Sequence, residues 1–149
     1  MRRAVLLRSV QRVLGDGAGV RDAAYVWTRH RWSIPFAAMV FAGIALVAPI
    51  ADIEDWPTRI VLGLAGVAVA VNASTTYRVL AETDDGIVLL KASRIRQVAT
   101  GVEQKLPANT DLKPVGGTII ATDWLVGNQE YTAPRSSEQA MQRMAASRP

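Results

Sequence analysis

The sequence contains no cysteine and a single histidine, His30, among its 149 residues. Without cysteine the chain can form neither a disulfide nor a thiolate metal site, and thiol redox chemistry is excluded. One histidine cannot supply a carboxylate–histidine cluster, and His30 lies between Arg29 and Arg31 in a basic segment. The glycine-rich segment 15–19 lacks the lysine of a phosphate-binding loop. We therefore expect a protein that is not an enzyme, with no catalytic residue, no cofactor and no metal site.

Charge is absent from two long segments. Residues 34–51 and residues 60–77 each form a run of eighteen residues without a charged side chain. An α-helix rises about 1.5 Å per residue, so each run would be roughly 27 Å long, close to the thickness of a bilayer core. Trp32 and Trp56 flank the first run as candidate interface anchors, because amphipathic rings favour the headgroup level. The pattern predicts two transmembrane helices, over about 34–51 and 60–76; the alternative is a buried helix pair of a soluble protein.

Positive charge is concentrated before the first apolar run. Residues 1–33 contain seven arginines and two acids, whereas residues 52–59 contain three acids and one arginine. Lys and Arg near membrane ends favour the cytoplasmic side, so we expect both termini to be cytoplasmic. The apolar run starts more than thirty residues into the chain and is followed by acids, unlike a cleaved signal peptide. Arg29, Arg31 and Arg78 are candidate contacts to lipid headgroups.

Small residues recur on both apolar runs at spacings that let helix backbones approach closely. The residues predicted to form this helix contact are Ala38, Ala42 and Ala45 on the first run, and Gly66, Ala70 and Ser74 on the second.

Residues 1–33 form a basic N-terminal arm ahead of the first run. Apolar residues from Val5 to Leu14 recur every three to four positions, with arginines between them, which is typical of a short amphipathic helix. The glycines of segment 15–19 then end it. Three alternatives stay open for this helix: it lies on the inner leaflet, it covers one side of the C-terminal domain, or it is disordered.

After the second run the apolar pattern changes to that of strands, which predicts a small β-rich domain over residues 77–149. Residues 77–83 and 87–91 are two runs of strand formers around Asp84-Asp85-Gly86, a β-hairpin pattern. Residues 118–122 and 130–132 are predicted to form a second pair, with Gly127-Asn128 as the turn. Residues 93–114 fit either an irregular strand or a helical turn before Pro107.

The end of the chain is predicted to form a helix over residues 137–146. Ser136 and Gln139 have the spacing of a capping box, and Pro134 lies just ahead of them. An apolar stripe of Ala140, Met141, Met144 and Ala145 would close one side of the sheet. The fold class is therefore α+β, with a two-helix transmembrane hairpin followed by a small β-rich domain and a C-terminal helix.

Residues 77–90, Tyr-Arg-Val-Leu-Ala-Glu-Thr-Asp-Asp-Gly-Ile-Val-Leu-Leu, resemble the first hairpin of bacterial pleckstrin-homology-like (PH-like) small membrane proteins of the actinobacterial type. Segment 106–111, the hairpin around Trp124 and the last helix extend the resemblance over about half the chain. It implies a seven-stranded fold with a capping helix, although only 72 residues follow Tyr77. Family members often carry a basic residue after the turn, where this chain has Gly86-Ile87, so the residues here do not support a phosphoinositide headgroup pocket.

These observations favour a non-enzymatic protein of the bacterial cell membrane. Its cytoplasmic PH-like domain would bind a protein partner or the membrane surface; the alternative is an accessory subunit of a larger membrane complex. Residues 77–149 are nearly neutral, with nine basic and eight acidic side chains, so the net charge of +4 reflects the N-terminal arm. We expect that arm to attract anionic lipid rather than nucleic acid. Membrane lipids and an unidentified protein are the expected partners, and a homo-oligomer is compatible with the sequence.

Overall fold

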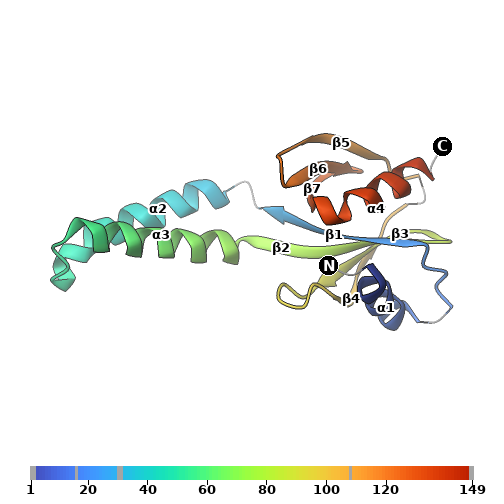
Figure 1. The fold of residues 1–149 in the computed structure, drawn as a ribbon, viewed down its shortest axis with the longest axis horizontal. Helices are drawn as coiled ribbons and strands as arrows, with labels where there is room; N and C mark the ends of the chain where they lie inside the picture. The colour runs from blue at the N-terminus through green and yellow to red at the C-terminus, as the bar shows by residue number, and fades with distance from the viewer. Residues whose placement is uncertain (1–2, 16, 30–31, 108, 148–149) are drawn as a thin grey trace. The chain divides into compact units, whose positions relative to one another are not determined.

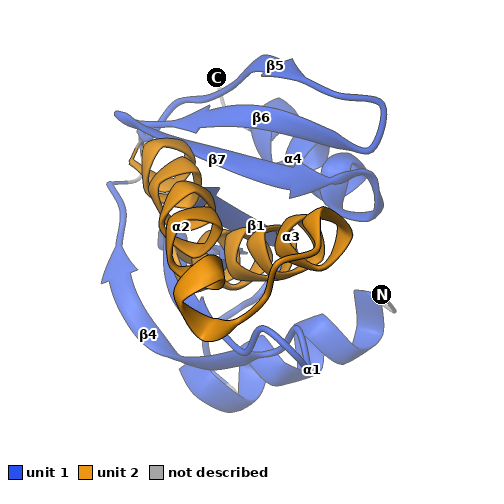
Figure 2. Cartoon of the chain, turned by 90° about the vertical axis from the view of Figure 1, so that its left-hand side faces the viewer, with its two compact units in different colours: residues 1–28, 77–149 blue, residues 29–76 orange. Residues whose placement is uncertain are grey.

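A computed structural model describes residues 3–15, 17–29, 32–107 and 109–147. The chain divides into two units, coloured separately in Figure 2. One, the sheet unit, comprises residues 1–28 and 77–149, and the other, the apolar helix pair, comprises residues 29–76. The N-terminal arm is therefore not a separate region, because its residues up to Thr28 belong to the same unit as the C-terminal domain.

The sheet unit is built on a seven-stranded antiparallel sheet with the strand order β4-β3-β2-β1-β7-β6-β5. Its strands are β1 (Asp22–Arg29), β2 (Thr75–Thr83), β3 (Gly86–Ala92), β4 (Ala99–Lys105), β5 (Leu112–Gly117), β6 (Ala121–Val126) and β7 (Gln129–Pro134). Helix α1 (Arg3–Leu14) precedes the sheet and helix α4 (Arg135–Ala146) follows it. The central strand β1 comes from the N-terminal arm, where no strand was predicted.

Each face of the sheet carries its own hydrophobic core. On strand β1, Ala24 and Val26 contribute to one core, whereas Ala23 and Tyr25 contribute to the other. This alternation follows from the two-residue period of a strand, and burial on both faces explains why central strands are almost continuously apolar. Helix α4 covers the first face and helix α1 covers the second (Figure 1). Of the alternatives for the N-terminal helix, the structure favours the one in which it covers the β domain.

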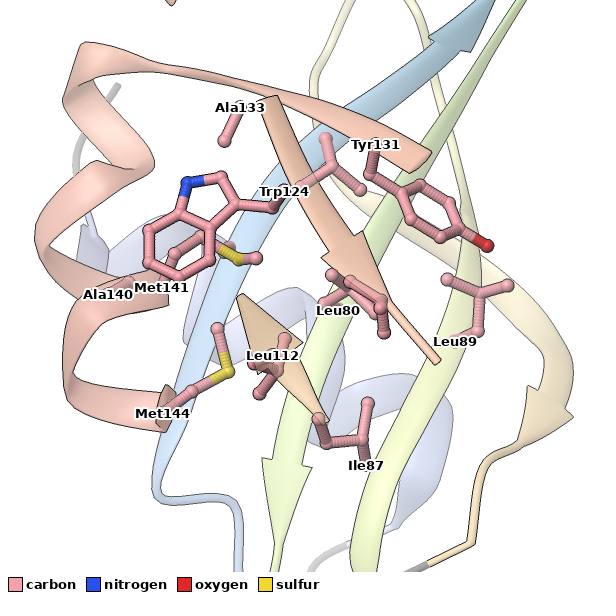
Figure 3. Packing of buried hydrophobic residues seen from close by; sticks show 13 residues of the cluster. Leu80, Ile87, Leu89, Leu112, Trp124, Tyr131, Ala133, Ala140, Met141 and Met144 are labelled. Atoms are coloured by element: carbon pink, nitrogen blue, oxygen red, sulfur yellow. The ribbon is translucent and has the colours of Figure 1, made fainter. Parts of the chain in front are cut away.

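The core under α4 contains most of the large apolar side chains of the C-terminal segment. Met141 and Met144 are fully buried there, and Trp124 and Tyr131 of neighbouring strands lie in the same cluster (Figure 3). The predicted apolar stripe of the last helix is therefore confirmed, with Ala145 partly buried at its margin. The predicted capping box is wrong, because the helix begins at Arg135 and has no side-chain cap at its first turn.

The two predicted hairpins have different outcomes. The first is confirmed, since β2 and β3 pair from Arg78↔Lys91 to Thr83↔Gly86 around a two-residue turn. In the second, Gly127-Asn128 does form the turn between β6 and β7, but residues 118–120 are not in a strand. They form the connection after Gly117, whose φ of +154° places the chain so close to Ala121 that a Cβ would lie 2.7 Å from its carbonyl oxygen. The ambiguous segment 93–114 contains a turn, strand β4 and the start of β5.

The apolar helix pair consists of α2 (Ser33–Val47), a short 3₁₀ helix (Ala48–Ala51) and α3 (Trp56–Ala73). Both helical segments, Ser33–Ala51 and Trp56–Ala73, are long and apolar enough to cross a membrane by length and composition. The second begins four residues earlier than predicted because Asp55 caps it, its Oδ2 accepting a hydrogen bond from Thr58 N at 2.9 Å. It also ends earlier, since strand β2 starts at Thr75.

On α2, the helix contact involves residues other than the predicted ones. Ala38 and Ala42 are exposed, and Ala45 is only half-buried. Gly63 lies against Phe41, where a Cβ would approach within 2.6 Å of the ring, and Gly66 lies against Ile44. Glycine on α3 therefore makes room for large side chains of α2, rather than small residues meeting small residues.

On α3, one of the three predicted small residues contacts the other helix. Gly66 meets Ile44 and Val40, and Ala70 is buried. Ser74 is half-buried, and its hydroxyl donates to Val71 O within the same helix at 3.0 Å. Of the predicted residues, the structure thus brings Gly66 against α2, whereas Ala38 and Ala42 are exposed.

Candidate functional site

Arg78 holds four strands of the sheet unit together. Its Nε and Nη2 atoms donate to the two carboxylate oxygens of Glu103, each at 2.7 Å, and Nη1 donates to Thr28 Oγ1 at 3.1 Å. The guanidinium also lies 6.0 Å from the centroid of the Tyr131 ring. Bonding to Arg78 lowers the pKa of Glu103, and the same pair raises the pKa of Arg78. Arg78 was predicted as a headgroup contact; in the structure its Nε, Nη1 and Nη2 atoms each donate to another strand of the sheet.

The remaining predicted surface residues have separate outcomes. Arg29 is exposed at the last position of β1, directly before the apolar helix pair, whereas Arg31 and His30 lie outside the described residues. Trp32 and Trp56 are 59% and 66% exposed. Trp56 is the first residue of α3, and Arg59 of the same helix lies 5.5 Å from its ring centroid. Both tryptophans remain candidates for interface anchors.

Asp22 forms a second polar centre, which the sequence did not indicate. Its carboxylate is only 4% exposed and accepts from Arg3 Nε of α1 at 3.2 Å and from Arg143 Nε of α4 at 2.7 Å. The backbone N–H of Ala23 donates to the same side chain at 2.9 Å. A buried carboxylate needs such partners because desolvation disfavours its charged form. One side chain at the start of β1 thus joins the two helices that cover opposite faces of the sheet.

Tyr25 is a buried polar group of a different kind. Its ring stacks on Tyr77 with centroids 5.9 Å apart, and its hydroxyl oxygen is buried without a hydrogen-bond partner among the described residues. Burial, assisted by Tyr77, raises the pKa of Tyr25 from 10.0 to about 12. The neutral form is therefore the one that suits the folded state.

Replacing Tyr25 with Phe should leave the free energy of unfolding at pH 7 unchanged or raise it by about 1 kcal/mol, because an unpaired buried hydroxyl is removed. Below pH 10 both states of the wild-type chain keep the phenolic proton. Between pH 10 and about 12 the unfolded state loses it first, so wild-type stability should fall with rising pH by an extra 2 to 3 kcal/mol, roughly. The Tyr25→Phe variant should lack this extra loss.

Thermal unfolding of the full chain in detergent across this pH range measures the difference between the two proteins. Parallel pH profiles would show that folding does not raise the pKa of Tyr25, and a variant clearly less stable at pH 7 would show that the hydroxyl is hydrogen-bonded in the folded state.

An open cleft in the sheet unit has a volume of about 790 Å³. Three chain segments surround it: the end of β4, the connection between β4 and β5, and the turn between β6 and β7. Its polar lining comes mainly from Gln104, Asn109, Thr110, Asn128, Gln129 and Tyr131, and we call it the amide cleft. The connection is tied to the turn, because Gly127 N donates to Asp111 O at 3.0 Å.

The chemistry available in the amide cleft is that of hydrogen bonding. Tyr131 Oη donates to Gln129 Oε1 at 3.0 Å, and burial raises the pKa of Tyr131. The neighbouring ammonium of Lys113 lowers the pKa of Asp111, the single carboxylate in the described lining. These shifts favour the ionised form of Asp111 and the protonated form of Tyr131. Side-chain amides that both donate and accept suit a peptide-like ligand.

Together these features define an α+β protein that joins a seven-stranded antiparallel sheet to a pair of apolar helices. Comparison with known proteins assigns it no relative: no family model, no curated protein and no solved structure matches the chain.

Proposed function

We propose that this chain is an integral protein of the bacterial cell membrane whose two-helix anchor holds a PH-like domain at the cytoplasmic surface. The domain binds a segment of a protein partner in the amide cleft and catalyses no reaction. The observation that carries this proposal is the exposed apolar surface of the helix pair, which interrupts the sheet unit between β1 and β2.

The exposure of the helix pair supports insertion in a bilayer. Only 11% of the residues in each helical segment are buried. Large apolar side chains that a soluble protein would cover are exposed by up to 82%, including Ile34, Phe36, Met39, Leu46, Val47, Ile50, Val61, Leu64 and Val69. A contiguous apolar surface of this size marks a site of contact with a membrane or another protein. The helices satisfy their own backbone hydrogen bonds, as a chain in lipid must.

Strand order supports the PH-like assignment. The resemblance implies a fold of seven strands followed by a helix, and the structure has seven strands in one sheet. The 72 residues that follow Tyr77 are few for seven strands and a helix. The first strand, β1, lies before the apolar helix pair, so the later segment supplies only six strands and α4. The anchor thus replaces a short connection between two neighbouring strands, and the domain is tethered at two points, after Thr28 and before Tyr77.

The amide cleft supports partner binding. It is open, its side chains are uncharged apart from Asp111, and its two walls are joined by the Gly127–Asp111 hydrogen bond. A site of this kind recognises backbone amides of an extended segment without requiring charge on it.

In-cell crosslinking tests the cleft. A photoreactive amino acid at Asn128, which lines the cleft, should give a discrete crosslinked product in carbonate-washed membranes. The same amino acid at Gln142, an exposed position on α4, should not. Adding Asn109→Lys in the cleft should suppress the product from position 128. Equal products from both positions, or an insensitive product, would contradict binding in the cleft.

The same preparation separates the proposal from its alternative. If purification in mild detergent yields a stoichiometric integral-membrane companion that crosslinks from the exposed helix face, the chain is an accessory subunit of a larger complex. Isolated monomers or homodimers would favour the anchored binding domain.

A further inference from the structure

The turn between β3 and β4, residues 93–98, lies at the end of the sheet unit from which the chain leaves for the apolar helix pair. Lys91 of β3 pairs with Arg78 near the start of β2, and the turn follows directly. Arg94 of the turn lies 6.0 Å from the ring centroid of Tyr77. The C-terminal end of β1 lies at this same end of the sheet, because Thr28 Oγ1 accepts a hydrogen bond from Arg78. Just before the start of β1, Arg21 N donates to Glu82 O near the other end of β2. We call residues 93–98 the basic turn.

The basic turn combines positively charged side chains with one apolar side chain that is almost fully exposed to solvent. Ile95 is 92% exposed, and Arg94 and Arg96 on either side of it are exposed as well. Lys91 adds a third cation, and residues 86–102 contain no acid. A single exposed isoleucine is ordinary on a protein surface. An isoleucine between two arginines, within a stretch free of acids, is complementary to an anionic lipid surface, which offers phosphates above a hydrocarbon layer.

Hydrogen bonds hold the basic turn in one shape. Ser93 N donates to Val98 O at 2.9 Å, and Gln97 N donates to Ser93 O at 2.8 Å. Arg96 N donates to the Ser93 hydroxyl at 3.3 Å, and Gln97 adopts a left-handed φ of 52°. Ile95 lies between these bonded positions and is 92% exposed, so the backbone that carries it is already ordered before the side chain enters a lipid layer.

We propose that the basic turn docks on the anionic membrane surface beside the anchor, with Ile95 at the boundary between headgroups and acyl chains and with Arg94 and Arg96 on lipid phosphates. This inference rests on the proposed membrane anchoring. It adds a third point of attachment to the two tethers, and so limits the orientations in which the sheet unit can stand on the membrane.

The absence of cysteine allows a direct test in the full chain. Ile95→Cys carries an environment-sensitive fluorophore, and the protein is reconstituted in phosphatidylcholine vesicles with or without phosphatidylglycerol. Lipids with a spin label on the acyl chain should quench the fluorophore at position 95. The matched control is Ile119→Cys, an 86% exposed isoleucine in the connection between β5 and β6 whose neighbours in the sequence, Thr118 and Ile120, are uncharged. Its fluorophore should not be quenched.

Charge is tested with Arg94→Gln and Arg96→Gln, which should weaken docking in vesicles with phosphatidylglycerol by about fivefold for each arginine removed. In pure phosphatidylcholine these changes should have little effect. Equal quenching at positions 95 and 119, or none at 95, would overturn the inference. Vesicle flotation after carbonate treatment separates the two levels: a protein that floats without quenching at 95 is anchored but not docked, whereas one that does not float refutes the anchoring itself.

Discussion

Replacing Leu64 with arginine should remove most of the protein from the carbonate-resistant membrane fraction. Leu64 lies near the middle of α3 and is 57% exposed, so in water the substitution would replace an exposed apolar side chain with a better hydrated one. At the centre of a membrane helix an arginine instead costs about 2.5 to 3.5 kcal/mol, which corresponds to an approximately hundredfold change in an equilibrium. The same substitution thus has opposite effects in the two environments.

The matched control for Leu64→Arg is Val115→Arg on strand β5 of the sheet unit. Val115 is 53% exposed, and a surface change there should alter the free energy of unfolding by no more than about 0.5 kcal/mol. Its membrane fraction should equal that of the wild type. If the wild type is itself extracted by carbonate, or if Leu64→Arg leaves the carbonate-resistant fraction unchanged, the helix pair does not reside in a bilayer, and the proposed function fails with it.

Replacing Asp22 with alanine should cost the sheet unit about 3 kcal/mol of stability. The carboxylate is almost completely buried and accepts charge-assisted hydrogen bonds from Arg3 and Arg143, each worth more than a neutral bond. The two arginine side chains are 57% and 47% exposed, so they regain water when the carboxylate is removed. The loss should therefore stay below the largest values seen for fully buried pairs.

Asp84→Ala provides the comparison for Asp22→Ala. Asp84 also pairs with an arginine, Arg21, at 2.8 Å, but both side chains are more than 60% exposed. Surface pairs of this kind contribute about 0 to 1 kcal/mol. Thermal unfolding in detergent, with hydrogen exchange of α1 and α4 as a local readout, measures both variants. Equal destabilisation by the two substitutions would show that Asp22 does not connect the helices.

Local pattern was enough to predict some elements of the sheet unit. The hairpin of β2 and β3 follows from two runs of strand formers around a turn, and α4 follows from its apolar stripe. Strand β1 was missed because its sequence, Asp-Ala-Ala-Tyr-Val-Trp-Thr-Arg, begins with weak strand formers and pairs with partners far along the chain. The strand prediction for residues 118–120 was wrong for the opposite reason. Ile119 and Ile120 have high strand propensity, yet the close backbone approach at Gly117 turns the chain there.

The candidate sites depended even more on distant contacts. Arg78 was predicted to contact lipid headgroups, but Glu103, which lies 25 positions away in the sequence, accepts two of its hydrogen bonds. Asp22 gave no signal, since its partners Arg3 and Arg143 lie near opposite ends of the sequence. In the helix pair, the sequence pattern identified small residues but did not show which side chains they contact. Those contacts depend on the rotation of each helix about its axis and on the angle between the two helices.

The insertion of the helix pair between β1 and β2 has a consequence for biosynthesis. Strand β1 leaves the ribosome before the anchor, whereas its neighbours β2 and β7 are made after it. If the helix pair crosses the bilayer, β1 remains on the side where it was synthesised. It can pair with β2 only after the chain has crossed the bilayer a second time and returned to that side. After a single crossing, β2 would lie on the opposite side of the bilayer from β1. Strand β1 would then have no partner, and both of its apolar faces would be exposed to solvent. Completion of the sheet would then report correct insertion, and a wrongly inserted chain would present an unfolded segment for degradation.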